Sequence, residues 1–262
     1  MMTDEARKIP NVLACDIGNS SVQIACIHGS DSSARASFDN DDLSGLGDGL
    51  AAVWGEMGGS GTVAASSVNP EGLEALEAAA AKAIEQDVLV IGRDLPLPIE
   101  TSVPHPAGIG ADRLCAAAAA YDHLGVACVV ADFGSAITID CVDSEGLFQG
   151  GAILPGLRMG AKALASQTAQ LPEVQVAEPD WIYGQDTAQA IIGGLVRGAR
   201  GALRELIETY ATEMGSWPVV ILTGGDARVI CPDVNESELA QAVVDDLVLR
   251  GVAIAYYKFM LK

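Results

Sequence analysis

One short pattern occurs twice in this chain of 262 residues: an apolar run, an Asp-x-Gly turn and a second, alternating run. The first copy is Asp16-Ile17-Gly18-Asn19-Ser20 and the second is Asp132-Phe133-Gly134-Ser135-Ala136. Each copy predicts two strands joined by a tight turn. Backbone N–H groups at such a turn can cradle a phosphate, and the Asp can hold a cation. We therefore expect two related halves that meet near residue 115, each with its own phosphate-binding turn.

The rest of the chain alternates between predicted strands and predicted helices, which indicates an α/β fold with sheets covered by helices. A third glycine turn, Thr223-Gly224-Gly225, follows an apolar strand and suits a flat base or a ribose. Between 31 and 61 the chain is rich in Asp, Ser and Gly, and only a helical spacing of apolar residues stands out. Strands are predicted at 62–68, 88–91 and 219–222, and helices at 71–86, 112–123, 161–167, 187–209 and 237–260.

The composition argues against some classes of binding partner and indicates a cellular compartment. The formal charge of −20 argues against nucleic acid and anionic membranes as partners, and its simplest interpretation is a soluble, self-repelling surface. The six cysteines show no Cys-x-x-Cys spacing and mostly lie in apolar runs, which predicts buried, reduced thiols. The first ten residues lack the apolar segment of a signal peptide, and no stretch approaches the length of a membrane span. We therefore expect a cytoplasmic protein.

Seven motifs follow one another in a fixed order from about residue 11 to 255. The motifs are Asp16-x-Gly18-Asn19-Ser20, Gly110-x-Asp112-Arg113, Asp132-x-Gly134-Ser135-Ala136-x-Thr138, Gly150-Gly151-x-Ile153-x-Pro155-Gly156, Thr168-Ala169-x-Leu171-Pro172, Asp186-Thr187 and Thr223-Gly224-Gly225. This ordered set closely resembles the type III pantothenate kinases, members of the acetate kinase/sugar kinase/Hsp70/actin superfamily.

The resemblance implies a fold and an activity. It implies two related ribonuclease-H-like domains, at 1–115 and 116–262, each a mixed sheet flanked by helices, with a nucleotide cleft between them. It also implies ATP-dependent phosphorylation of pantothenate to 4′-phosphopantothenate, the first step of coenzyme A biosynthesis. Magnesium would accompany ATP, and potassium or ammonium would serve as a monovalent cation. Members of the family are homodimers whose substrate pocket lies at the subunit interface.

The resemblance also gives the acceptor site its residues. Asp112 would accept the proton of the substrate's primary hydroxyl, and Gly110, Ala111, Arg113 and Thr187 would contact the substrate. Gly110 allows close approach, and Arg113 can pair with an anionic or amide-rich group. A purely structural alternative remains for two of these residues, because Asp112 and Thr187 each open a helix-forming stretch and could be helix caps.

For the nucleotide, the resemblance implies contacts from the first turn and its flanks, with Asp16 near the magnesium. In the second half, Ser135 would touch ATP, Gly224 and Gly225 would face the adenosine, and Asp132 would hold the monovalent cation. The first-turn residues are Asp16, Ile17, Gly18, Asn19, Ser20, Ser21, Val22 and Gln23.

The sequence departs from the family pattern at a few positions. Val103 stands where the family often has Tyr, Ser135 and Ile137 stand where Thr is usual, and Asp186 replaces Asn. Val103 keeps a second hypothesis open, a kinase of the same fold acting on another small acceptor. A third hypothesis is a nucleotide-binding protein without turnover. Arg158 and Lys162, the basic residues nearest to Gly156, could assist with phosphate, but a solvated helix face is the favoured interpretation.

Overall fold

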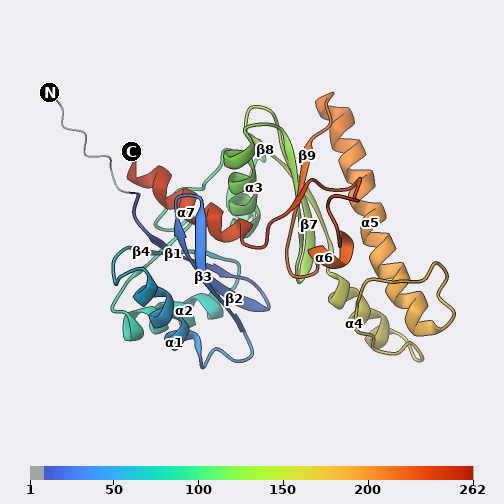
Figure 1. Ribbon diagram of the computed structural model, residues 1–262, viewed down its shortest axis with the longest axis horizontal. Coiled ribbons are helices and arrows are strands. Elements are labelled where there is room, and N and C mark those ends of the chain that lie inside the picture. Colours follow the sequence, from blue (N-terminus) through green and yellow to red (C-terminus); the bar gives the residue numbers. More distant parts are fainter. Residues whose placement is uncertain (1–8, 262) are drawn as a thin grey trace. The chain divides into compact units, whose positions relative to one another are not determined.

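The computed structural model describes residues 9–261, which form two compact units. Within the described residues, unit 1 comprises 9–100, 105–119 and 246–261, and unit 2 comprises 101–104 and 120–245. Each unit contains one five-stranded sheet with helices packed on it (Figure 1).

The sheet of unit 1 has the strand order β3-β2-β1-β4-β5. The first three strands form an antiparallel meander, and β4 and β5 join it in parallel. β1 and β2 pair in register from Val12 opposite Ile27 to Ile17 opposite Val22. The elements of this unit are β1 (Val12–Ile17), β2 (Ser21–His28), β3 (Asp31–Asp39), α1 (Leu46–Glu56), β4 (Thr62–Ser67), α2 (Pro70–Ala83), β5 (Val88–Val90), the short 3₁₀ helix η1 (Pro106–Gly108), the start of α3 (Ala111–Leu124) and α7 (Leu247–Met260).

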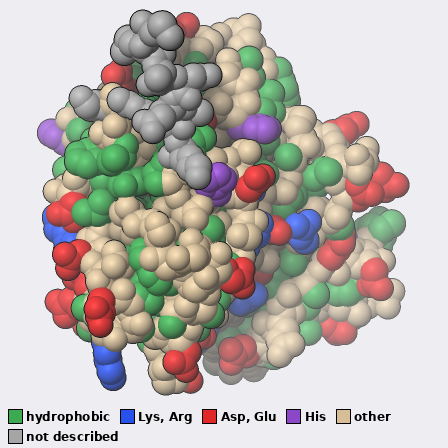
Figure 2. All heavy atoms as spheres, turned by 60° about the vertical axis from the view of Figure 1, so that its left-hand side comes forward, with side chains coloured by type: hydrophobic (Ala, Val, Ile, Leu, Met, Phe, Trp, Pro, Cys, Tyr) green, Lys and Arg blue, Asp and Glu red, His purple; other side chains and the backbone are tan. Residues whose placement is uncertain are grey.

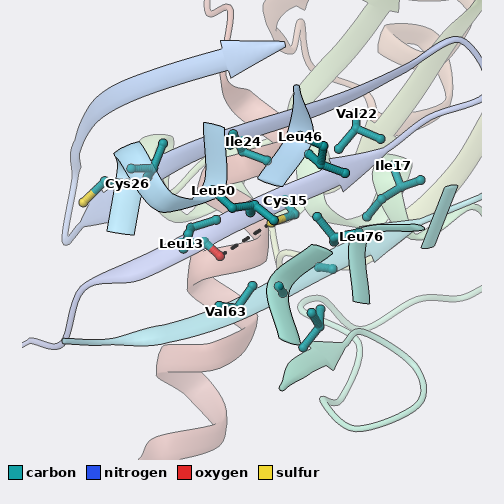
Figure 3. Packing of buried hydrophobic residues seen from close by; sticks show 14 of the residues in the cluster. Leu13, Cys15, Ile17, Val22, Ile24, Cys26, Leu46, Leu50, Val63 and Leu76 are labelled. Atoms are coloured by element: carbon teal, nitrogen blue, oxygen red, sulfur yellow. Dashed lines mark hydrogen bonds between the residues drawn. The ribbon is translucent and has the colours of Figure 1, made fainter. Parts of the chain in front are cut away.

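Apolar side chains cover both faces of this sheet. Leu13, Cys15 and Ile17 of β1 point to the face on which α1 and α2 pack, where they meet Leu50 and Leu76 (Figure 3). On the other face, Val12 and Ala14 of β1 are also fully buried, and α7 packs against β1, β2 and β4. Because successive side chains of a strand point to opposite faces, α7 covers the other face. Full burial of one large apolar side chain stabilises the folded state by about 1.5–3 kcal/mol relative to an exposed side chain.

Unit 2 repeats this plan with its own strands, in the order β10-β9-β6-β7-β8. β6, β7 and β8 form the antiparallel meander, and β9 and β10 add to β6 in parallel. Its core packs Val129, Ala131 and Phe133 of β6 against α4, α5 and α6. The elements of this unit are the end of α3, β6 (Cys128–Phe133), β7 (Ala136–Val142), β8 (Phe148–Pro155), α4 (Leu157–Gln167), α5 (Thr187–Met214), β9 (Val219–Thr223), α6 (Ala227–Ile230) and β10 (Ala242–Val243).

The shared strand order confirms the predicted fold of two related mixed sheets flanked by helices. Local structure differs from the prediction in two places. Residues 31–39 form β3, although their composition gave no strand signal, and residues 237–246 are not helical. The units also interleave along the chain, whereas the sequence predicts one boundary after residue 115. The last helix, α7, belongs to unit 1 because its apolar residues pack on that sheet.

All six cysteines are buried and free, as predicted from their place in apolar runs. Burial raises the pKa of the thiols of Cys128 and Cys141 to about 12 and about 11. Acidic side chains are spread over the face shown in Figure 2, with fewer basic ones between them. Across residues 9–261, no helix has both the length and the apolar composition needed to cross a membrane.

Candidate functional site

The first Asp-x-Gly turn joins β1 to β2 and is braced from outside the hairpin. The backbone N–H of Gly18 donates to the carbonyl of Ser21 at 3.0 Å. Asn40, which follows β3, donates from its side chain to the Gly18 carbonyl at 2.9 Å and from its backbone to the Ser20 carbonyl at 3.0 Å. Sequence reasoning missed Asn40, because its role depends on the pairing of β2 with the unpredicted β3.

The eight residues predicted to contact the nucleotide differ in how far their side chains are exposed. The side chains of Ile17 and Val22 are fully buried in the core, so only their backbones can serve a ligand. Gly18 has no positive φ, and a Cβ built on it would meet nothing nearer than the Ser21 carbonyl oxygen at 3.5 Å. The fold itself therefore has room for a side chain at Gly18. Asn19, Ser20 and Gln23 are exposed, and Asp16 and Ser21 are partly buried.

Two predicted site carboxylates of unit 1 affect the same buried thiol through their charges. Asp16 lies near the end of β1, and Asp112 lies in the first turn of α3. The pKa of Cys115 is raised well above its usual value, first by burial and then by the negative charges of Asp16 and Asp112. The negative charges of both carboxylates therefore act on the Cys115 thiol. Sequence reasoning did not assign Cys115 to the site, because nothing local marks it.

The Asp112 carboxylate is held by its own segment. Its Oδ1 accepts a hydrogen bond from the backbone N–H of Arg113 at 2.8 Å. A Cβ on Gly110 would lie 2.4 Å from this oxygen, so glycine leaves the space that the carboxylate occupies. Burial raises the pKa of Asp112, and this outweighs the lowering effect of the Arg113 N–H and charge. α3 begins at Ala111, which places Asp112 inside the first turn rather than at the helix cap.

In unit 2, the carboxylate of Asp132 lies against two glycine turns. Gly224 follows β9 with φ +91°, and a Cβ on it would lie 2.3 Å from Asp132 Oδ1 and 2.6 Å from the carbonyl carbon of Phe133. A Cβ on Gly134 would lie 3.3 Å from the same Asp132 oxygen. The absence of side chains at Gly224 and Gly134 thus lets both turns lie close to the Asp132 carboxylate. A carboxylate is the kind of ligand that hard cations prefer.

The remaining predicted residues of unit 2 lie at the surface. Ser135 and Gly225 are exposed in their turns. Thr187 is also exposed and is the first residue of α5, which places it on a different element from the turns. Asp186 is the cap of that helix, since its side chain accepts from the backbone N–H of Gln189 at 2.8 Å. Thr187 therefore does not serve as the cap of α5.

Charged groups of the kind that bind transition metals do not gather in the described part of the chain. Over residues 9–261, no group of three or more His, Cys, Asp or Glu side chains is placed to hold a metal ion.

Comparison with known proteins identifies the family. A model described as type III pantothenate kinase matches residues 12–209. The chain belongs to the type III pantothenate kinase family. A type III pantothenate kinase of Agathobacter rectalis is 37% identical over 193 residues, 73% of each chain. Another from Brevibacillus brevis is 30% identical over 253 residues, 94% of this chain and 98% of the relative. The resemblance predicted from the seven motifs is thereby confirmed.

Solved structures support the fold of this family member. A Campylobacter jejuni protein, described as a conserved putative Baf family transcriptional activator, matches with a TM-score of 0.61. It is 20% identical, and the match covers 96% of this chain and 100% of that one. A chain of the PilM–PilN type IV pilus biogenesis complex matches with a TM-score of 0.50 at 13% identity. At these identities the matches concern the fold alone.

Proposed function

We propose that this family member transfers the terminal phosphoryl group of ATP to the primary hydroxyl of pantothenate, giving 4′-phosphopantothenate in the first step of coenzyme A biosynthesis. Family membership supports the reaction class, and the relatives named above carry the same activity in their names. The observation that carries the proposal is Asp112, a partly buried carboxylate with a raised pKa in space left open by Gly110.

The geometry of Asp112 suits the acceptor side of the reaction. Phosphoryl transfer needs little covalent chemistry from the protein and depends on positioning and on neutralising charge. Asp112 would orient the acceptor hydroxyl and take its proton as the new P–O bond forms. A raised pKa makes Asp112 a stronger base than an ordinary exposed carboxylate. Gly110, Ala111 and Arg113 would line the acceptor pocket, with Arg113 donating hydrogen bonds to the substrate.

The first turn would hold the nucleotide phosphates through its backbone N–H groups. Gly18 supports this role, because the fold leaves room for a side chain there and close approach of a ligand would explain the glycine. Asp16 would be the nearest carboxylate to a magnesium ion, which supplies positive charge that offsets the charge of the transferring phosphoryl group. Ser135, Gly224 and Gly225 would contact the nucleotide from unit 2.

Asp132 would hold a potassium or ammonium ion. The Asp132 carboxylate, against which both glycine turns lie, supports this assignment, as does the net charge of −20, which otherwise disfavours a polyanionic nucleotide. The cation would add local positive charge on the nucleotide side of the site.

Homodimerisation and a cytoplasmic location complete the proposal. Ile182 and Tyr183 are 78% and 81% exposed and lie just before Thr187, the predicted substrate contact. Large apolar side chains with this exposure suit burial against a second copy. Light scattering of the purified protein should give twice the monomer mass of 26.9 kDa, and a monomer at assay concentrations would contradict the dimer.

Coupled ATP turnover with and without pantothenate, in potassium and in sodium, tests the proposal. We expect pantothenate-dependent turnover that potassium stimulates. Asp112→Asn should lower kcat/KM by about 10²–10⁴-fold, the usual contribution of a general base. Asp122→Asn is the matched control, since Asp122 is exposed on the same helix and should be dispensable. Absence of pantothenate-dependent turnover in the wild type would refute the proposed acceptor.

Val103 supports one second candidate, the same reaction on another small alcohol. It lies in unit 2 beside Gly150, and its Cγ2 would be 3.6 Å from a Cβ built there. An apolar group thus stands where a Tyr hydroxyl is usual in the family. A screen of small hydroxyl compounds distinguishes the two candidates: a compound with a higher kcat/KM than pantothenate would favour this alternative. ATP binding without turnover on any acceptor would instead indicate a non-catalytic protein.

A further inference from the structure

Three turns of unit 2 come together at one end of its sheet. A Cβ on Gly156, between β8 and α4, would lie 2.3 Å from the carbonyl oxygen of Ser135 in the β6–β7 turn. The turn after β9 is equally close, since a Cβ on Gly224 would lie 2.6 Å from the Phe133 carbonyl carbon. Asp226 extends this contact, because its backbone N–H donates to the Phe133 carbonyl at 2.9 Å. The start of α4 therefore adjoins the turns predicted to contact the nucleotide.

Arg158, the second residue of α4, places a cation at this junction. Its Nη2 lies 3.3 Å from Oδ1 of Asp226, which follows the Gly224-Gly225 turn. The Arg158 side chain is 84% exposed, and that of Asp226 is 12% exposed. A guanidinium carries five N–H donors, so this single contact leaves most of them facing solvent. An ion pair with one partner so exposed adds little to stability, so stability alone does not account for Arg158.

The helix dipole at the start of α4 disfavours the positive charge of Arg158. The N-terminal end of a helix carries partial positive charge, which disfavours a cation in the first turn by about 0.3–1 kcal/mol. The first turn of α4 contains no acidic residue, and its cap Gly156 supplies no side-chain hydrogen bond. A cation at this position becomes favourable when an anion binds beside it. The chain has only 15 Lys and Arg residues, so one placed here against the helix field is notable.

We propose that Arg158 binds the phosphate groups of the nucleotide, and that Asp226 holds its guanidinium beside the Gly224-Gly225 turn. This assignment rests on the proposed function, because it takes the three turns to be the nucleotide side of the site. It also replaces the sequence-based interpretation of Arg158 as part of a solvated helix face. Lys162 keeps that interpretation, since it lies one turn further along α4 and is exposed.

Direct binding of adenosine, ADP and ATP with magnesium, measured by calorimetry, tests the proposal. Arg158→Ala should weaken ADP and ATP binding about 10-fold, the loss of one exposed charge-assisted hydrogen bond. Binding of adenosine should be unchanged, because it has no phosphate. Arg158→Lys should recover part of the affinity, and Lys162→Ala should match the wild type. In steady-state assays, the KM for ATP should rise while the KM for pantothenate stays the same.

The outcomes separate this proposal from the proposed function. Unchanged ADP and ATP binding in Arg158→Ala, or an equal loss for adenosine, would overturn the role of Arg158 while leaving pantothenate-dependent turnover intact. If the wild type binds ADP through Arg158 but shows no turnover with pantothenate, the acceptor is wrong and the role of Arg158 stands. A wild type that binds none of the three compounds would count against both.

Discussion

The two units share one strand order and one Asp-x-Gly turn, yet their glycines serve different needs. In unit 1, a side chain at Gly18 would meet no close atom, and Gly110 leaves room for the catalytic carboxylate proposed at Asp112. In unit 2, Gly156 and Gly224 are enclosed by backbone atoms of neighbouring turns. Glycines therefore leave open space or room for a carboxylate in unit 1, and they allow neighbouring turns to pack closely in unit 2. Substitution of these glycines tests that difference.

The largest effect is expected at Gly110, on activity. Gly110→Ala places a Cβ 2.4 Å from Asp112 Oδ1, so the carboxylate must move. A displacement of about 1 Å at a reacting group can cost about 100-fold in rate, and we expect kcat/KM to fall by that order. Gly108→Ala is the control, because a Cβ there meets no atom within 4 Å. Equal activities of the two variants would show that Asp112 does not need its observed position.

The next largest effect is expected at Gly224, on stability. Gly224→Ala combines a φ of +91° with a contact of 2.3 Å to Asp132. Backbone strain and overpacking together should lower the free energy of unfolding by about 2–5 kcal/mol, measured by denaturant titration. Gly225→Ala has open space and should change it by less than about 0.5 kcal/mol. Similar stability of both variants would remove the distinction drawn for unit 2.

Gly18→Ala should show the opposite behaviour to Gly224→Ala. Its free energy of unfolding should stay within about 0.5 kcal/mol of the wild type, because the turn accommodates a Cβ. The KM for ATP should rise about 10-fold, because a methyl group would obstruct a phosphate held by backbone N–H groups. Loss of stability with unchanged KM would assign Gly18 to the fold, as in unit 2.

The smallest effect concerns how stability depends on pH in unit 1. Burial raises the pKa of Asp112, so the ionised carboxylate destabilises the folded state at neutral pH. Asp112→Asn should therefore be more stable than the wild type at pH 7, and the gain should disappear once the pH falls below the unfolded-state pKa. Thermal unfolding from pH 7 down to pH 3.5 measures this difference. A variant less stable than the wild type at pH 7 would contradict the burial of Asp112.

Asp246 titrates with the opposite sign in the same unit. Burial would raise the pKa of this carboxylate, but hydrogen bonds and charges from Arg250, Ser32 and Arg35 lower it overall. Its contribution to stability is present above the unfolded-state pKa and is lost as the pH falls through the lower, folded-state value. The folded state thus stabilises the ionised form of Asp246 and disfavours the ionised form of Asp112, the proposed base.

The sequence was sufficient for the parts of the fold that depend on local patterns. Both hairpins, the helices near 112–123 and 187–209 and the three glycine turns could be predicted, because apolar periodicity and turn residues lie close together in the chain. β3 could not, since its residues are mostly polar and its strand state comes from pairing with β2. The predicted helix from 237 begins only at Leu247, and residues 242–243 instead pair with β9.

The sequence offers the candidate site as a set of residues and not as an arrangement. Motif order pointed to Asp16, Asp112 and Asp132, and their roles stay predictions. The charge interaction of Asp16 with Cys115 and the contact of Arg158 with Asp226 both join segments far apart in the sequence. Such contacts are set by tertiary packing, which no local pattern encodes.

The reactivity of the six buried cysteines can report local unfolding in each unit. Unit 1 contains Cys15, Cys26 and Cys115, and unit 2 contains Cys128, Cys141 and Cys231. A thiol reacts with an alkylating reagent only after it becomes accessible and ionised, so native-state labelling rates follow local unfolding. Mass spectrometry of the labelled peptides would separate the two sets and give an opening free energy for each half of the protein. Ligands that stabilise one unit would then be recognised by the set of thiols that they protect.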